Sequence, residues 1–230
     1  MIEQFLQAAK LSEDAHRGQV RKGTSIEYFS HPLAVAADVL GRGGDYDQAQ
    51  AGLCHDILED CGPEYEDQIK ALGEMTHRIV LDCSDCIKGQ GPKLGWYIRK
   101  LEYILNFHHK HPKSYLVVCC DKLHNSGATV TESRNMGFDC LTKFRAPPEM
   151  VCWYFVALTC ELQKGADLGY LPESAVTDLR YNTEAMIALL TDHPDWDANY
   201  MNIYKTITSL HEMLQTNDPL VCQLSEGYFK

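Results

Sequence analysis

The sequence predicts an all-α protein, and three observations lead to this expectation. Apolar residues recur at helical spacing through most of the chain, as on the buried faces of amphipathic helices. Glycine and proline mark the ends of these periodic segments. Hydrophobic residues make up 45% of the chain and charged residues 23%, which are ordinary proportions for a protein with a buried core.

The first half of the chain contains three predicted helices before the first strong stop signal. The first is amphipathic, and the second has Pro32 in its first turn, where a helix tolerates proline. Gly62-Pro63 ends the third. A basic loop, 19–22, and a flexible break, 41–45, separate them. The predicted helices cover 2–15, 32–40 and 47–61.

The rest of the chain also reads as helices. Segment 114–126 is very apolar before Asp121, so we expect it to be central. Its valines would also suit a strand, but its length and i, i+4 pattern favour a helix. The linker 145–148 precedes the C-terminal helices. The predicted helices are 63–72, 74–85, 96–109, 114–126, 149–164, 172–190 and 199–215.

We expect two parts, a helical bundle over 1–165 and a helical C-terminal extension over 166–230 that packs on it. The net charge of −11 disfavours nucleic acid polymers and anionic membranes as partners, but it allows a small anionic ligand beside a local basic patch. No apolar run approaches the roughly 20 residues of a membrane span, and the N-terminus lacks signal-peptide features, so a cytoplasmic location is expected. The ten cysteines are expected to be reduced. No pattern points to an oligomeric state.

Two histidines and two aspartates form a candidate metal site. They are His31, the adjacent pair His55-Asp56, and Asp121. Adjacent helical residues project about 100° apart, so His55 and Asp56 can approach one ion from two directions. Imidazole and carboxylate ligands without thiolate suit manganese, iron or zinc better than calcium. Four protein ligands leave coordination positions for water and a phosphate oxygen.

Two further carboxylates follow one helical turn later. Glu59 is four residues after His55, and Asp60 is four residues after Asp56, so a continuous helix would place all four on one side. Burying such a set without partners would be costly, which favours a functional reason for it. Together, the metal set and these two carboxylates are suited to metal-assisted hydrolysis of a phosphate compound.

The ordered set His31, His55-Asp56 and Asp121 resembles that of the HD-domain metallophosphohydrolases. The residues around these four positions resemble the hydrolase domain of the RelA/SpoT family and the small alarmone hydrolases, over about residues 5–130. The stretches that carry this resemblance are Arg21-Lys22, Tyr28-Phe29-Ser30-His31-Pro32-Leu33-Ala34-Val35-Ala36, His55-Asp56-Ile57-Leu58-Glu59-Asp60, Trp96-Tyr97-Ile98-Arg99-Lys100-Leu101-Glu102-Tyr103 and Asp121-Lys122-Leu123-His124-Asn125.

The resemblance implies a manganese site and removal of the 3′-diphosphate of guanosine tetra- or pentaphosphate as pyrophosphate. It gives Glu59 and Asp60 the role of orienting or deprotonating the attacking water. It places Arg21 against the purine, Lys22 near phosphate and Asn125 at the nucleoside. A guanidinium can stack on a base and a lysine offers a compact charge to phosphate, which agrees with these roles. Lys122, Arg99 and Lys100 are candidates for further positive charge toward the substrate. Solvated surface positions are the alternative for each basic residue.

Two departures from the family pattern fall near the expected nucleoside pocket. Segment 23–27 is one residue longer, and Ser126-Gly127-Ala128-Thr129 replaces a Met-Arg-Thr continuation. They leave the base open: guanine, adenine or another. Two alternatives to alarmone hydrolysis also stay open. One is action on another phosphoester, such as a nucleoside monophosphate, a cyclic nucleotide or NADPH. The other is a catalytically silent nucleotide-binding sensor or antitoxin.

Overall fold

The structure, a computed structural model, describes residues 2–89, 95–144 and 146–191. Over these ranges it is built from helices, and an isolated bridge between Val20 and Glu27 closes the loop after the first helix. The prediction of an all-α fold is confirmed. The α-helices are α1 (Ile2–Ala15), α2 (Ser30–Gly41), α3 (Tyr46–Cys54), α4 (Glu66–Leu72), α5 (Glu74–Cys83), α6 (Trp96–Leu105), α7 (Pro112–Met136), α8 (Asp139–Thr142), α9 (Pro148–Asp167) and α10 (Glu173–Thr191).

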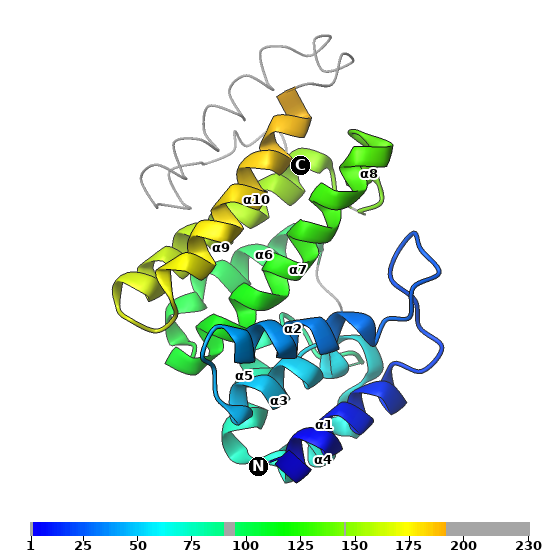
Figure 1. The fold of residues 1–230 in the computed structure, drawn as a ribbon, viewed down its shortest axis with the longest axis vertical. Coiled ribbons are helices and arrows are strands. Elements are labelled where there is room, and N and C mark those ends of the chain that lie inside the picture. The colour runs from blue at the N-terminus through cyan, green and yellow to red at the C-terminus, as the bar shows by residue number, and fades with distance from the viewer. Residues whose placement is uncertain (1, 90–94, 145, 192–230) are drawn as a thin grey trace.

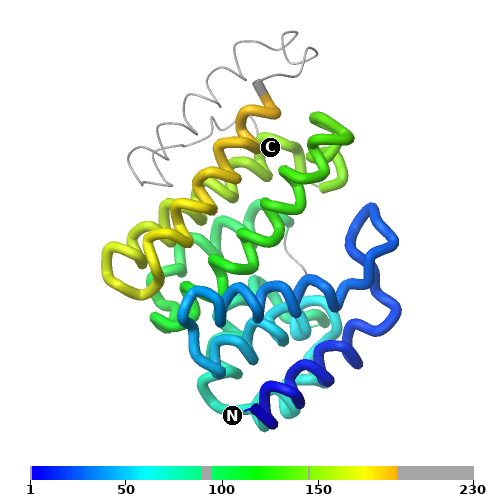
Figure 2. The backbone as a smooth tube through the Cα atoms, in the orientation of Figure 1, coloured from blue at the N-terminus to red at the C-terminus, as the bar shows by residue number. Residues whose placement is uncertain are grey.

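The helices form two neighbouring groups that share α7 (Figure 1). Helices α1 to α5 gather at the N-terminal end, and α9 and α10 pack along α7 at the other end. Helix α7 also packs against α2, α3 and α5, so it joins the two groups. The backbone trace shows the loop between α1 and α2 extending beside the bundle (Figure 2). This arrangement places the α1–α2 loop and the middle of α7 on the same side.

A glycine allows α2 and α3 to approach closely. A Cβ atom on Gly52 would lie 3.3 Å from the Cα and backbone nitrogen of Ala36. Such contacts are tighter than ordinary packing, so a larger residue would separate the two helices. Helix α3 itself begins at a capping box, in which Asp45 accepts a hydrogen bond from the Gln48 amide at 3.0 Å. The close approach brings the end of α3 to the start of α2.

The prediction of one helix over 47–61 is wrong. Helix α3 ends at Cys54, and a single π-helical turn, η1 (Ile57–Cys61), follows. The carbonyl of Gly52 would accept from the Asp56 amide in a continued helix, and here it accepts from the ring of His55 at 2.8 Å. Gly62 ends the π turn at a φ of 142°, a backbone conformation that favours glycine.

Other helix boundaries also differ from the predictions. Helix α6 stops at Leu105, where the Asn106 side chain donates to the carbonyl of Glu102 at 2.9 Å, and a 3-10 turn, η3 (Phe107–His109), follows. Helix α7 continues to Met136, so 126–129 lies inside a helix. The predicted helix 63–72 begins as a 3-10 turn, η2 (Pro63–Tyr65). The predicted helix 199–215 lies outside the described residues.

The core runs through both groups of helices. Buried residues of α10, such as Leu179 and Met186, belong to the same apolar cluster as Val35 of α2 and Leu53 of α3. The division into 1–165 and 166–230 stays a prediction.

The nine cysteines within the described ranges are free thiols, as expected. Among the described residues, no helix is both long and apolar enough to cross a membrane.

Candidate metal centre and nucleotide pocket

The four predicted metal ligands converge from α2, the end of α3 and α7. The Nε2 atom of His31 lies 3.1 Å from Oδ1 of Asp121 and 3.4 Å from Oδ2 of Asp56. The Nε2 atom of His55 lies 3.1 Å from Oδ2 of Asp56 and 3.5 Å from Oδ1 of Asp121. Residues 90 positions apart in the sequence therefore direct their nitrogen and oxygen atoms at a common point.

These residues fit a divalent metal ion. The Nε2 atoms of His31 and His55 are buried and have no hydrogen-bond partner. The other ring nitrogen of His55 donates to the Gly52 carbonyl, so Nε2 is the nitrogen that can bind a metal ion once it has lost its proton. Buried polar atoms without a partner are rare in folded proteins. The structure thus contains a possible His/Asp metal site.

The charges in this group are compatible with a bound cation. Burial alone would lower the pKa of His55, but Asp56 and Asp121 raise it well above its ordinary value. Burial likewise would raise the pKa of Asp121, yet Lys122 and His55 hold it well below the usual range. Burial would also raise the pKa of Asp56, but His55 and His31 hold it well below the usual range. A metal ion would take the place of the histidine proton between the two ionised carboxylates, with release of that proton.

Side chains around the group fix the two carboxylates. The hydroxyl of Tyr28 donates to Oδ2 of Asp56 at 2.6 Å. Asp121 accepts at Oδ2 from Lys122 at 2.5 Å and at Oδ1 from Asn125 at 2.6 Å. Such partners orient metal ligands and restrict their rotation. Sequence reasoning assigned no role in the site to Tyr28.

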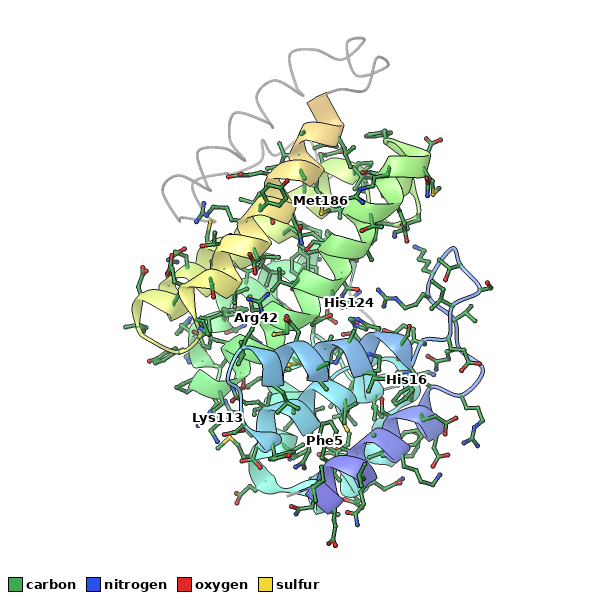
Figure 3. The ribbon with its side chains drawn as sticks, viewed as in Figure 1. Phe5, His16, Arg42, Lys113, His124 and Met186 are labelled. Atoms are coloured by element: carbon green, nitrogen blue, oxygen red, sulfur yellow. The ribbon has the colours of Figure 1, made fainter. Side chains whose placement is uncertain are left out.

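His124 holds the ring of His31 from the side away from the candidate metal position. Their Nδ1 atoms lie 2.8 Å apart, and their ring centroids 4.7 Å apart. Burial, together with the nearby charges of His31 and Arg21, lowers the pKa of His124 to about 4. In Figure 3, His124 lies between α7 and α2, where the α1–α2 loop approaches.

Glu59 and Asp60, the predicted catalytic pair, lie on the π turn beside the metal ligands. Burial raises the pKa of Glu59 to about 7, although Lys100 opposes the shift, and Asp85, Asp56 and Asp60 add to it. Asp60 is more exposed than Glu59. Its backbone carbonyl accepts from the amine of Lys88 at 2.8 Å. A carboxyl group with a pKa near 7 can exchange a proton at physiological pH.

Two of the predicted substrate-binding residues, Arg99 and Lys100, contact a carboxylate that sequence reasoning missed. Arg99 donates to Oδ1 of Asp85, and Lys100 lies 2.6 Å from Oδ2 of that nearly buried side chain. Arg99 also lies 3.8 Å from Oε1 of Glu59. Lys100 and Lys122 both face the ring of Tyr154, at 4.8 and 5.9 Å from its centroid. These three basic residues form one buried cationic group near Glu59 and Asp121.

Arg21, Lys22 and Asn125 line a pocket of about 380 Å³ between the α1–α2 loop and α7. Arg21 donates to Oδ1 of Asn125 at 2.7 Å, and Asn125 in turn donates to the candidate ligand Asp121. The pocket therefore adjoins the metal-ligand group. Both departures noted in the sequence contribute to its wall, through Thr24, Ile26, Ala128 and Thr129.

The chain matches the HD domain family over residues 8–126. It belongs to that family. Helices α2, α3 and α7 of this HD domain carry the two histidines and two aspartates described above.

Curated relatives match part of the chain. It is 34% identical over 79 residues to the bifunctional (p)ppGpp synthase/hydrolase SpoT of Escherichia coli, covering 34% of this chain and 11% of that protein. It is 30% identical over 126 residues to a GTP pyrophosphokinase of Streptomyces coelicolor, covering 54% of this chain and 14% of the relative. The chain thus spans about a tenth of the length of these relatives.

A solved structure of a metazoan SpoT ortholog, described as hydrolysing ppGpp and acting in starvation responses, has the same fold. The TM-score is 0.55 at 20% sequence identity, over 80% of this chain and 94% of the other. At this identity the likeness establishes the helical HD architecture.

Proposed function

We propose that this HD domain is a metal-dependent hydrolase that removes pyrophosphate from the 3′ position of (p)ppGpp or a related alarmone. His31, His55, Asp56 and Asp121 would hold the metal ion, with manganese as the proposed occupant. The observation that carries the proposal is the pair of buried, unpartnered imidazole nitrogens beside two ionised carboxylates, next to a pocket lined by Arg21 and Lys22. The similarity to (p)ppGpp hydrolases supports the choice of substrate.

The basic residues divide into two groups that suit a nucleotide with separate phosphate groups. Arg21 and Lys22 lie in the pocket, where a guanidinium can stack on the base. Lys100 and Lys122 lie by Tyr154, near the metal ligands, where they would balance the charge of the departing pyrophosphate. The net charge of −11 makes these local cations necessary for binding an anion.

The proposed reaction breaks the bond between the 3′ oxygen and its phosphorus. A bound metal ion would polarise the phosphate and lower the pKa of an attacking water molecule. Glu59 accepts the proton of that water, and Asp60 orients it. The water oxygen forms the new bond to phosphorus, and the 3′ oxygen leaves and gains a proton. Lys122 keeps Asp121 in place throughout, by its bond at 2.5 Å.

The test is product analysis with manganese-loaded protein and ppGpp. We expect GDP and pyrophosphate, and loss of turnover in both Asp56→Ala and Glu59→Ala. Unchanged turnover in either variant, or orthophosphate as the product, contradicts the proposal. A panel containing nucleoside monophosphates, cyclic nucleotides and NADPH identifies another phosphoester substrate. Nucleotide binding without turnover of any of them indicates a sensor or antitoxin.

A further inference from the structure

One wall of the pocket is a single face of α7. Asn125, Ala128, Thr129 and Glu132 line it at positions i, i+3, i+4 and i+7, which share one side of a helix. Glu132 is the only acid among the described residues that line the pocket. A carboxylate in a pocket that otherwise offers cations to an anionic ligand calls for a specific role.

The carboxylate of Glu132 is fixed in place. Lys143 donates to its Oε2 atom, and the side chains of Glu132 and Lys143 are 28% and 18% exposed. Oε1 makes no hydrogen bond with the described residues. Ala128 lies one turn before Glu132 on the same face of α7, and both line the pocket. The small side chain of Ala128 leaves room there for a ligand group.

The remaining walls suit a flat base. Phe144 and Ile26 line the pocket, and the ring of Phe144 lies 5.9 Å from the amine of Lys22. Arg21 lies at the end of the pocket nearest the metal ligands, through its bond to Asn125. Apolar and aromatic walls with a few placed polar groups are typical of nucleoside sites. The base edge of a ligand bound there can reach the carboxylate.

We propose that Glu132 reads the edge of the base and makes the pocket select guanine over adenine, a specificity that rests on the proposed function. A carboxylate only accepts hydrogen bonds. Guanine offers two adjacent donors, its ring N1–H and its exocyclic amino group, whereas adenine offers an amino donor beside an acceptor nitrogen. Glu132 can therefore accept hydrogen bonds from both donors of guanine. Opposite adenine, its carboxylate would face a ring nitrogen that is also an acceptor, and the two would repel each other.

The experiment measures binding of GDP and ADP to the full chain by calorimetry. Wild type is expected to prefer GDP, and Glu132→Gln is expected to reduce that preference about 10-fold, since hydrogen bonds to a charged acceptor are stronger than those to a neutral one. Glutamine keeps the size of the side chain, and thermal melting confirms that the variant is folded. The loss should fall on GDP, with ADP unchanged or tighter.

Lys143→Met is the matched control. It removes the partner of Glu132 but keeps the acceptor, so the ratio of GDP to ADP affinity should stay at the wild-type value even if both affinities fall. If Glu132 only neutralises Lys143, both variants change the two affinities in parallel, and the proposal is overturned. Equal binding of GDP and ADP by wild type also overturns it. The GDP and ADP affinities are measured without hydrolysis. Failure of the proposed function would therefore appear separately, as absence of pyrophosphate release from ppGpp.

Discussion

Burial gives Glu59 its chemical character. The side chain is 24% exposed and lies near Asp85, Asp56 and Asp60, three carboxylates that oppose its ionisation. A general base works best when its pKa is close to the working pH, because it is then both ionised and able to hold a proton. Burial and Asp56 also raise the pKa of Asp60, although Tyr28 opposes the shift.

The pH dependence of turnover should report Glu59. With a pKa raised to about 7, Glu59 is protonated and inactive as a base below that pH, and it becomes ionised above it. We expect kcat to rise with pH through about 7 and then level off. Glu59→Gln should lose most activity, roughly 100-fold or more, and the residual rate should lack this rise. A rate that rises with the same midpoint in the variant would assign the titration to another group.

His124 should affect metal binding. It holds the ring of His31 through the contact between their Nδ1 atoms, and loss of such a partner typically weakens metal affinity by about 10–100-fold. We expect His124→Ala to show this loss in manganese titrations followed by calorimetry. His77→Ala is the control, because His77 pairs with Glu66 away from the site. Equal manganese affinity in wild type and His124→Ala would show that His31 needs no such support.

At this scale the sequence predicted ligand identities better than their partners. Residue type and spacing selected His31, His55, Asp56 and Asp121, and the structure brings all four together. Tyr28 and Asp85 were not predicted, because their roles depend on contacts across the fold that no local pattern encodes. Tyr28 contacts Asp56, and Asp85 contacts Lys100. The catalytic and binding roles of the selected residues stay predictions until the variants are measured.

Among the elements, the junction of α2 and α3 matters most for the site. The two helices approach at Gly52 and Ala36, and they carry His31 and His55 respectively. The sequence predicted both helices but not the break after α3. Periodicity does not reveal that the His55 ring donates a hydrogen bond to the Gly52 carbonyl, which a continued helix would have used. Single π turns often occur at functional sites, and η1 carries Glu59 and Asp60.

Widening this junction should weaken both stability and metal binding. Gly52→Val would place its side chain against the backbone of Ala36, and overpacking of this kind costs roughly 1–3 kcal/mol. We expect a matching loss in urea unfolding and a lower manganese affinity, because His31 and His55 move apart.

Gly127→Ala is the matched control for this prediction. Its Cβ would lie 3.6 Å from the nearest atom, an ordinary contact, in the interior of α7. Alanine there should be neutral or stabilising by up to about 1 kcal/mol. Gly52→Val with wild-type manganese affinity would show that the helix spacing does not set the site.

The whole molecule is organised around α7, which contacts the N-terminal helices on one side and α9 and α10 on the other. The apolar cluster continues into α10, where Ala175, Val176 and Leu179 are fully buried. Helical periodicity predicted these helices. It did not predict their packing, because the pairing of helix faces depends on the shapes of the surfaces that meet.

Leu179→Ala tests whether α10 unfolds together with the metal-binding helices. Removing this buried side chain should cost about 2–5 kcal/mol. If the chain unfolds as one unit, hydrogen exchange of the most protected amides of α2 and α3 should accelerate by the same free energy as that of α10. Tyr181→Ala, at a side chain 72% exposed, should change stability by less than about 0.5 kcal/mol. Acceleration confined to α10 would support a separately stable extension.

The pair His31–His124 links the metal to the pocket through tautomer choice. Their facing Nδ1 atoms can share only one proton, and a metal ion on Nε2 of His31 requires that this proton belong to His31. His124, kept neutral by its low pKa, must then carry its own proton on Nε2. His124 also lines the pocket, so a bound metal ion fixes its Nε2 as a hydrogen-bond donor. Ligands with an acceptor at this point and the metal ion therefore favour each other's binding, to an equal extent.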